Sequence, residues 1–309
     1  MEAASVSAQQ TTAQRPRSKG MPERRLAKVM VTPSLILIAV VAAWPIIYAI
    51  WLSLHEYSVR VAGLSRWAGP IGLRNYSTAL QDSDWWAAFA HTMIFTVASV
   101  SLETVIGLGM ALAMHAAFRG QGLLRTVVLV PWAVLTVVTA VMWRTMFVSP
   151  YGFVNTILGT NTIWLGSEPQ ALIVIIIADV WKTAPFMALL ILAGLQVISD
   201  DIYEAAKVDG ASTWQRFTKI TLPLLMPAIL VALIFRTLDA LRIFDLPYVL
   251  TQGQFGTSTL STIAQENFAT NRIYGLGSAM AVLTFIVVML VSFGYIRFVG
   301  GNIRGLADE

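Results

Sequence analysis

One polar stretch decides how this chain is interpreted: residues 199–223, which read SDDIYEAAKVDGASTWQRFTKITLP and lie between two long apolar segments. Its first part opens with Asp200 and Asp201, which favour the start of a helix because carboxylates are stabilised by its free N–H groups and its positive dipole end. Good helix formers follow. Gly210 then permits a backbone conformation that a residue with a Cβ resists, and helices commonly stop at such a position. The pattern predicts a short helix that ends in a tight turn.

A second short helix is expected directly after this turn. Ser212, followed three residues later by Gln215, fits a capping box, and Pro223 suits the first turn of the next apolar helix. Two short helices on a membrane surface, with Trp214 exposed, are typical of a docking surface for another protein.

The composition indicates a membrane protein. Of the 309 residues 56% are hydrophobic and only 12% are charged, whereas soluble domains carry about 25% charged residues. There are no cysteines, which excludes disulfides, thiolate metal sites and cysteine nucleophiles. The net charge of +4 does not indicate nucleic-acid binding. In a membrane protein the significance of this charge depends on which side of the bilayer each Lys and Arg lies.

Six apolar segments are long enough to cross a bilayer, which takes about 20 residues each. The fold class predicted from them is an all-α membrane protein with six transmembrane helices, at residues 29–54, 89–115, 123–148, 170–196, 224–250 and 277–299. The transmembrane domain is therefore 29–299. Residues 1–28 are expected to be a disordered basic cytoplasmic tail, and residues 300–309 a second cytoplasmic tail.

The positive charges set the expected orientation. With the N-terminus inside, thirteen Lys and Arg residues fall on the cytoplasmic side and four on the outside. This distribution satisfies the positive-inside rule and predicts that both termini are cytoplasmic. It also places residues 199–223 in the cytoplasm.

Three short motifs in the polar stretch resemble a known family. Glu204-Ala205-Ala206, Asp209-Gly210-Ala211 and residues 220–223 (ITLP) resemble the EAA loop of binding-protein-dependent ABC importer permeases. The spacing spans a whole loop, which makes the match more specific than a single tripeptide. The resemblance implies a type I ABC importer permease fold and a loop that docks into an ATPase subunit. The coupling residues that it implies are Tyr203, Glu204, Ala205, Ala206, Asp209, Gly210 and Ala211.

The resemblance also implies partners and a cargo. It is strongest to the disaccharide and glycerol-phosphate branch of the sugar permeases and points to trehalose as the cargo. The implied partners are a second, different permease subunit, a dimer of ATPase subunits, an extracytoplasmic sugar-binding lipoprotein near the loop 251–259, and membrane lipid. No partner nucleic acid is expected, and the expected location is the cytoplasmic (inner) membrane.

Catalytic motifs are missing from the chain. It has no GxxxxGK[ST] loop, no HExxH helix and no GxSxG elbow. We therefore expect no catalytic residue, no metal and no cofactor in this chain, with ATP and Mg²⁺ bound by the partner ATPase.

Ionisable residues inside apolar segments are costly and are candidates for function. Asp179 and Lys182, three residues apart, share a helix face and could neutralise each other. The segment 224–250 carries four charged residues that alternate in sign every three positions: Arg236, Asp239, Arg242 and Asp245. In one unbroken helix they could not all face one pore, because each step rotates the face by about 60°. Pro247 indicates a break near the outer surface.

Two roles remain open for these charges. They either join helices or line a polar path that offers donors and acceptors to sugar hydroxyls. For the path we single out Trp181, Lys182, Asp239, Arg242, Phe244, Asp245 and Asn267, of which Trp181, Lys182 and Asn267 are supported by the family resemblance. The paired Trp85 and Trp86 are expected to belong to an interfacial aromatic belt.

Two alternatives come from other classes. A gradient-driven secondary transporter would use Asp239 and Asp245 as a relay, but the Glu204 loop and the absence of an inverted repeat speak against it. A membrane-embedded transferase would need a metal-binding acidic cluster at the interface, and none is evident in the sequence.

Overall fold

The computed structural model describes residues 23–61, 64–116 and 119–307. The chain divides into two compact units, Met1–Tyr48 and Ala49–Glu309. The expected disordered tail lies mostly outside the described residues, but its last residues are already helical, because α1 begins at Glu23.

The first apolar segment is one long helix with a wider turn in its middle. It comprises α1 (Glu23–Ile38), the π-helical η1 (Ala39–Ala43) and α2 (Trp44–Ser53). Residues 25–53 are long and apolar enough to cross a membrane.

Three helices form the centre of the second unit: α4 (Ser83–His115), α8 (Gln170–Leu195) and α11 (Leu222–Ala240). Two buried apolar clusters hold them together. One cluster includes Phe95, Val174 and Ala240, and the other includes Met114, Ile191 and Leu225. The segments Ser83–His115, Gln170–Leu195 and Thr213–Ala240, which contain these helices, are long and apolar enough to cross a membrane.

The predicted span 123–148 is broken. It consists of α5 (Gln121–Ala133) and α6 (Thr136–Phe147), which are bent by 89° at the break. Val134 and Leu135 both have ψ of 136°, an extended conformation that ends the first helix. The described residues thus contain five candidate spans, or six when the bent pair is counted as one. A short helix, α7 (Phe153–Leu158), follows.

The predicted span 224–250 also differs from one straight helix. Its helix begins earlier, because α10 (Thr213–Arg216), η2 (Phe217–Thr221) and α11 run on without a non-helical residue. It ends at Ala240, and α12 (Asp245–Thr251) starts after a four-residue connection. The break therefore precedes Pro247, which lies in the first turn of α12, where a missing N–H costs nothing.

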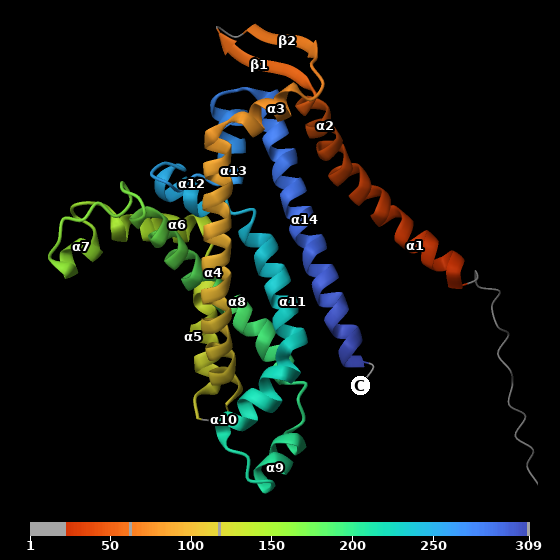
Figure 1. Cartoon of the computed structure of the whole chain (residues 1–309), viewed down its shortest axis with the longest axis vertical. Coiled ribbons are helices and arrows are strands. Elements are labelled where there is room, and N and C mark those ends of the chain that lie inside the picture. The colour runs from red at the N-terminus through yellow and green to blue at the C-terminus, as the bar shows by residue number, and fades with distance from the viewer. Residues whose placement is uncertain (1–22, 62–63, 117–118, 308–309) are drawn as a thin grey trace, which may run out of the picture. The chain divides into compact units, whose positions relative to one another are not determined.

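The two ends of this unit carry different structures (Figure 1). One end carries α9 (Asp200–Val208) and α10. The opposite end carries α3 (Arg74–Gln81) and a two-stranded antiparallel hairpin, β1 (His55–Val61) and β2 (Leu64–Pro70). The sequence did not predict the hairpin, because its short strands lack a clear alternation of apolar and polar residues.

The last spanning helix is α14 (Tyr274–Ala307), which packs against α13 (Leu260–Gln265) and the π-helical η3 (Glu266–Thr270). Trp85 of α4 packs against α13 and α14. Its side chain is 3% exposed and lies in a buried cluster with Leu260 and Met280. Only Trp86 is exposed, so the expectation of a paired aromatic belt is wrong for Trp85, which tertiary packing takes into the core.

Close helix contact predicts a stability difference between two glycines of α4. A Cβ at Gly107 would lie 2.8 Å from the Cβ of Met187 on α8, whereas a Cβ at Gly109 would meet nothing within 4 Å. We expect Gly107→Ala to lower the stability by about 1–3 kcal/mol through overpacking, and Gly109→Ala to be neutral or stabilising. Thermal unfolding of both variants in detergent measures this, and equal melting temperatures would contradict it.

Candidate functional site

The predicted helix–turn–helix of residues 199–223 is present at one end of the second unit. Ser199 caps α9 by accepting a hydrogen bond from the backbone of Asp201 at 3.3 Å. Gly210 has φ of +77°, the left-handed conformation that ends the helix. Ser212 and Gln215 form the expected capping box with distances of 2.8 and 3.2 Å. The second helix is not separate, because it continues into α11.

The candidate coupling residues form a small surface on α9 and its turn. Glu204, Ala205, Asp209 and Gly210 are exposed, while Ala206 and Ala211 are half-buried. Tyr203 faces inward, and its hydroxyl lies 3.1 Å from that of Thr221 in η2. This hydrogen bond connects α9 to the helix that continues as α11. α9 is therefore joined to α11 both by the turn and by the hydrogen bond of Tyr203.

A buried ion cluster lies farther along α11. Arg236, which is 2% exposed, donates from Nε and Nη2 to the two oxygens of Glu103 on α4, at 2.5 and 3.0 Å. Nη2 also donates to Asp179 on α8, and Nη1 donates to Asp239 at 2.8 Å. The cation thus satisfies carboxylates from three helices. Breaking such a buried arrangement costs more than forming it gains, because the remaining charge is left without a partner.

Asp179 and Lys182 are not paired as the sequence suggested. Asp179 bonds to Arg236, and the Lys182 ammonium donates to the backbone oxygens of Val134 at 2.8 Å and Trp132 at 3.5 Å. These carbonyls lie at the break between α5 and α6, where the helix supplies no N–H partner. Lys182 therefore supplies hydrogen-bond donors to non-helical backbone. Within a membrane, such backbone is tolerated only where it is buried in protein or lines a cavity.

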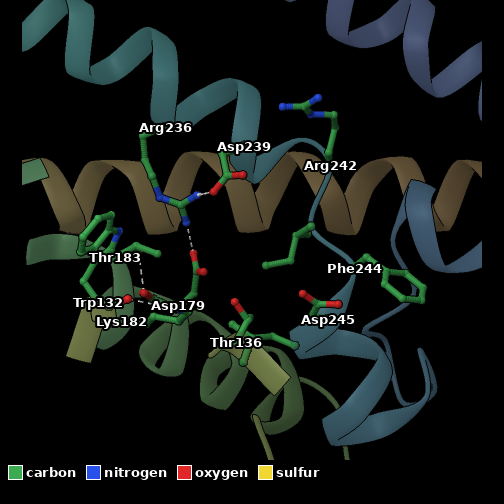
Figure 2. Close-up of a pocket in the computed structure, with 12 residues that line it drawn as sticks. Trp132, Thr136, Asp179, Lys182, Thr183, Arg236, Asp239, Arg242, Phe244 and Asp245 are labelled. Atoms are coloured by element: carbon green, nitrogen blue, oxygen red, sulfur yellow. Dashed lines mark hydrogen bonds and ion pairs between the residues drawn. The ribbon is translucent and has the colours of Figure 1, made fainter. Parts of the chain in front are cut away.

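A cavity of about 310 Å³ opens beside the cluster (Figure 2). It lies where α5, α6, α8, α11 and α12 meet, and its lining includes five of the seven residues singled out for the path: Lys182, Asp239, Arg242, Phe244 and Asp245. All four charged residues that alternate in sign along the chain line it: Arg236, Asp239, Arg242 and Asp245. The break after Ala240 makes this possible, since the four residues do not lie on one ideal helix.

The other two candidates lie away from this cavity. Trp181 is 37% exposed, and its ring packs against that of Trp143 with centroids 6.1 Å apart. Asn267 donates to the backbone of Ile263 at 3.0 Å and to the sulfur of Met280 at 3.4 Å. The lining also includes Trp132, Thr136 and Thr183, which carried no signal in the sequence.

Comparisons with known proteins agree on one family. Residues 103–305 match the family described as binding-protein-dependent transport system inner membrane component. The chain is 44% identical over 285 residues to the trehalose transport system permease protein SugA of Mycobacterium tuberculosis, with 92% of each chain covered. It is also 44% identical over 280 residues to the trehalose/maltose transport system permease protein MalF of Thermococcus litoralis, covering 89% of this chain and 94% of the relative.

The fold matches a solved structure as well. A chain of a bacterial ABC transporter involved in the import of the acidic polysaccharide alginate aligns with a TM-score of 0.78 and 22% identity, over 89% of this chain and 94% of that one. This likeness confirms the expected importer-permease architecture.

The ion cluster predicts a large effect of removing its cation. Arg236→Met leaves Glu103 and Asp179 buried without a cationic partner, so we expect a loss of about 3 kcal/mol or more in the free energy of unfolding. Adding Glu103→Gln and Asp179→Asn should restore most of it. Arg144→Met is the matched control, because Arg144 is exposed and makes one long hydrogen bond, 3.4 Å to Val249.

Thermal unfolding and the fraction of monodisperse protein in detergent measure these differences. If Arg236→Met were as stable as Arg144→Met, the cluster would not hold the three helices together.

Proposed function

This chain belongs to the family of binding-protein-dependent transport system inner membrane components, and on that premise we propose that it carries trehalose across the membrane at the expense of ATP hydrolysed by a partner. As a member of this family it is a permease subunit of an ABC importer rather than an enzyme, and it is a multi-pass component of the inner membrane. Permeases of this kind work with an ATPase and a periplasmic binding protein.

The cavity beside Arg236 is the observation that carries the proposal of a sugar path. Its volume of about 310 Å³ is at the lower end of the range for small-molecule sites. Its lining combines carboxylates, hydroxyls and the aromatic rings of Trp132 and Phe244. Such a lining suits a polyhydroxylated ring, which needs acceptors for its hydroxyl hydrogens and apolar faces for its carbons. The two relatives named for trehalose support this disaccharide as the cargo.

Coupling to ATP would pass through α9. The positive-inside rule supports a cytoplasmic position for this end of the molecule, where an ATPase dimer with its own ATP and Mg²⁺ would dock on the exposed surface around Glu204 and Gly210. Closure of the ATPase would then move α9, and the hydrogen bond from Tyr203 to Thr221 would carry the displacement into α11. Because α11 ends at the cavity, the same movement changes the access to it.

The remaining partners follow from the same proposal. A second, different permease subunit would complete the path, and an extracytoplasmic sugar-binding lipoprotein would deliver the cargo near the loop 251–259. Family membership favours this assembly over a gradient-driven carrier with Asp239 and Asp245 as a relay.

The first experiment is the ATPase activity of the reconstituted complex with its binding protein, measured across a panel of sugars. We expect stimulation of severalfold by trehalose and little by other sugars. Stimulation by another sugar would keep the importer and replace the cargo. No stimulation by any sugar, with uptake driven by an ion gradient instead, would overturn the ATP-driven proposal.

The turn at Gly210 provides a test of the coupling. Nothing lies within 4 Å of a Cβ built there, so the strain in Gly210→Val comes only from its φ of +77°. We expect this variant to insert and assemble normally but to lose at least about tenfold in sugar uptake per ATP hydrolysed. Gly210→Asn is the matched control, because asparagine tolerates the left-handed conformation. Normal uptake by Gly210→Val would contradict the proposed coupling through α9.

A further inference from the structure

The segment that connects α6 to α8 exposes an apolar surface. It contains the short helix α7, and between Arg144 and Glu168 the sequence has no charged residue. Five of its large apolar side chains are each more than half exposed: Tyr151, Phe153, Ile157, Leu158 and Ile163. Single exposed apolar residues are common on proteins, but a group of five within 13 residues indicates an interaction surface.

The exposed apolar side chains of α7 lie on one side of this helix. At about 100° per residue, Phe153, Ile157 and Leu158 fall within an arc of about 140°. Asn155 and Thr156 occupy the other side, where Asn155 is buried and Thr156 is exposed. α7 is therefore amphipathic, with an apolar side that is turned away from the residues that hold it.

Polar and aromatic contacts fix the segment in this orientation. Asn155, which is 2% exposed, donates to the carbonyl of Thr162 at 2.9 Å and accepts from the indole N–H of Trp164 at 2.8 Å. The ring of Trp164 packs edge-on against Phe147 of α6, with centroids 5.8 Å apart. Phe147 in turn stacks on Trp143 at 5.6 Å. α7 and the chain after it are thus held against α6 as one unit.

The bend between α5 and α6 sets the depth of this unit in a bilayer. α5 has 13 residues, a length of about 20 Å, which is short of a hydrocarbon core of about 30 Å. Because α6 is bent by 89° from α5, it runs along the bilayer instead of completing the crossing. Figure 1 shows α6 and α7 at a similar level of the molecule. The segment also ends in a span, because α8 begins at Gln170.

We propose that residues 149–165 form an interfacial anchor, a segment that lies in the lipid bilayer at its boundary with water. The apolar side of α7 is buried among the acyl chains, and Thr156 faces the headgroups. A lipid surface fits this segment because it is tied to membrane helices at both ends and lacks charge, and because Tyr151 and Trp164 are of the types enriched at the headgroup level. Amphipathic helices of this kind bury their apolar side by about 5–10 Å.

The anchor has a consequence for the bent pair of helices. Through Trp164 and Phe147 it holds α6 at one depth, and residues of α5 and α6 line the cavity beside Arg236. This inference goes beyond the proposed cargo and its coupling to ATP, since it depends only on the location of the chain in a membrane.

The absence of cysteine in the chain makes a direct test available, because one introduced cysteine can carry a nitroxide at a chosen position. Ile157→Cys and Phe153→Cys report on the apolar side of α7, and Thr156→Cys is the matched control on the polar side. The sample is the permease–ATPase complex without the binding protein, in nanodiscs of phosphatidylethanolamine and phosphatidylglycerol. Power-saturation EPR compares collisions with oxygen, which concentrates in lipid, and with a water-soluble nickel chelate. We expect the ratio of oxygen to nickel collisions to be at least about fivefold higher at positions 153 and 157 than at 156.

Other occupants of this surface give different results. A protein partner would lower the collisions of both reagents at position 157. Exposure to water would raise the nickel collisions at 157 to the level found at 156. Either result would overturn the proposal.

Removing the apolar side should release the segment from the lipid. In Phe153→Ser with Ile157→Ser, a nitroxide at Leu158→Cys should lose at least about threefold in the same ratio. Leu73→Ser with Leu80→Ser is the control, because these are exposed leucines at α3, outside the segment, and the ratio at 158 should persist. An unchanged ratio in the first variant would contradict the anchor. If that variant does not assemble, the labels in the otherwise native chain decide.

Discussion

The contact on which the rest of the second unit depends is the buried guanidinium of Arg236. It is held by Glu103 from α4 and Asp179 from α8, and it also bonds to Asp239 on its own helix. A cation at this depth is costly unless it is fully paired, and each carboxylate is costly without the cation. The three central helices therefore have one register in which all these charges are satisfied. Apolar packing brings the helices together, and the ion cluster fixes how they meet.

The irregular backbone of this unit is concentrated around the same place. The bend between α5 and α6 and the connection between α11 and α12 both border the cavity, and in a membrane such breaks are acceptable where protein or a polar cavity satisfies them. Lys182 satisfies carbonyls of the first break. Because of the second break, all four charged residues from Arg236 to Asp245 border one cavity. Helix breaks thus create the polar cavity that unbroken spans could not form.

One helix connects this cavity to the surface that we assign to the ATPase. From Thr213 to Ala240 the chain is helical over 28 residues, a length of about 42 Å at 1.5 Å per residue. Tyr203 binds α9 to its beginning, and Asp239 stands near its end. In the proposed mechanism this continuous helix is the link between the two sites. The same helix carries Arg236, so the ion cluster lies on that link as well.

The sequence by itself determined the membrane class, the apolar segments and the local structure of residues 199–223. These features depend on neighbours in the chain: hydropathy over about 20 residues, the cap at Ser212 and the left-handed turn at Gly210. Only the tertiary structure decided which charges pair. Asp179 and Lys182 are three residues apart on α8, yet their partners lie on α11 and at the α5–α6 break, because pairing in a membrane follows the packing of helices rather than spacing along one of them. For the same reason the sequence did not predict the helix breaks or the buried position of Trp85. It also did not predict that the charged residues from Arg236 to Asp245 line one cavity together with residues of other helices.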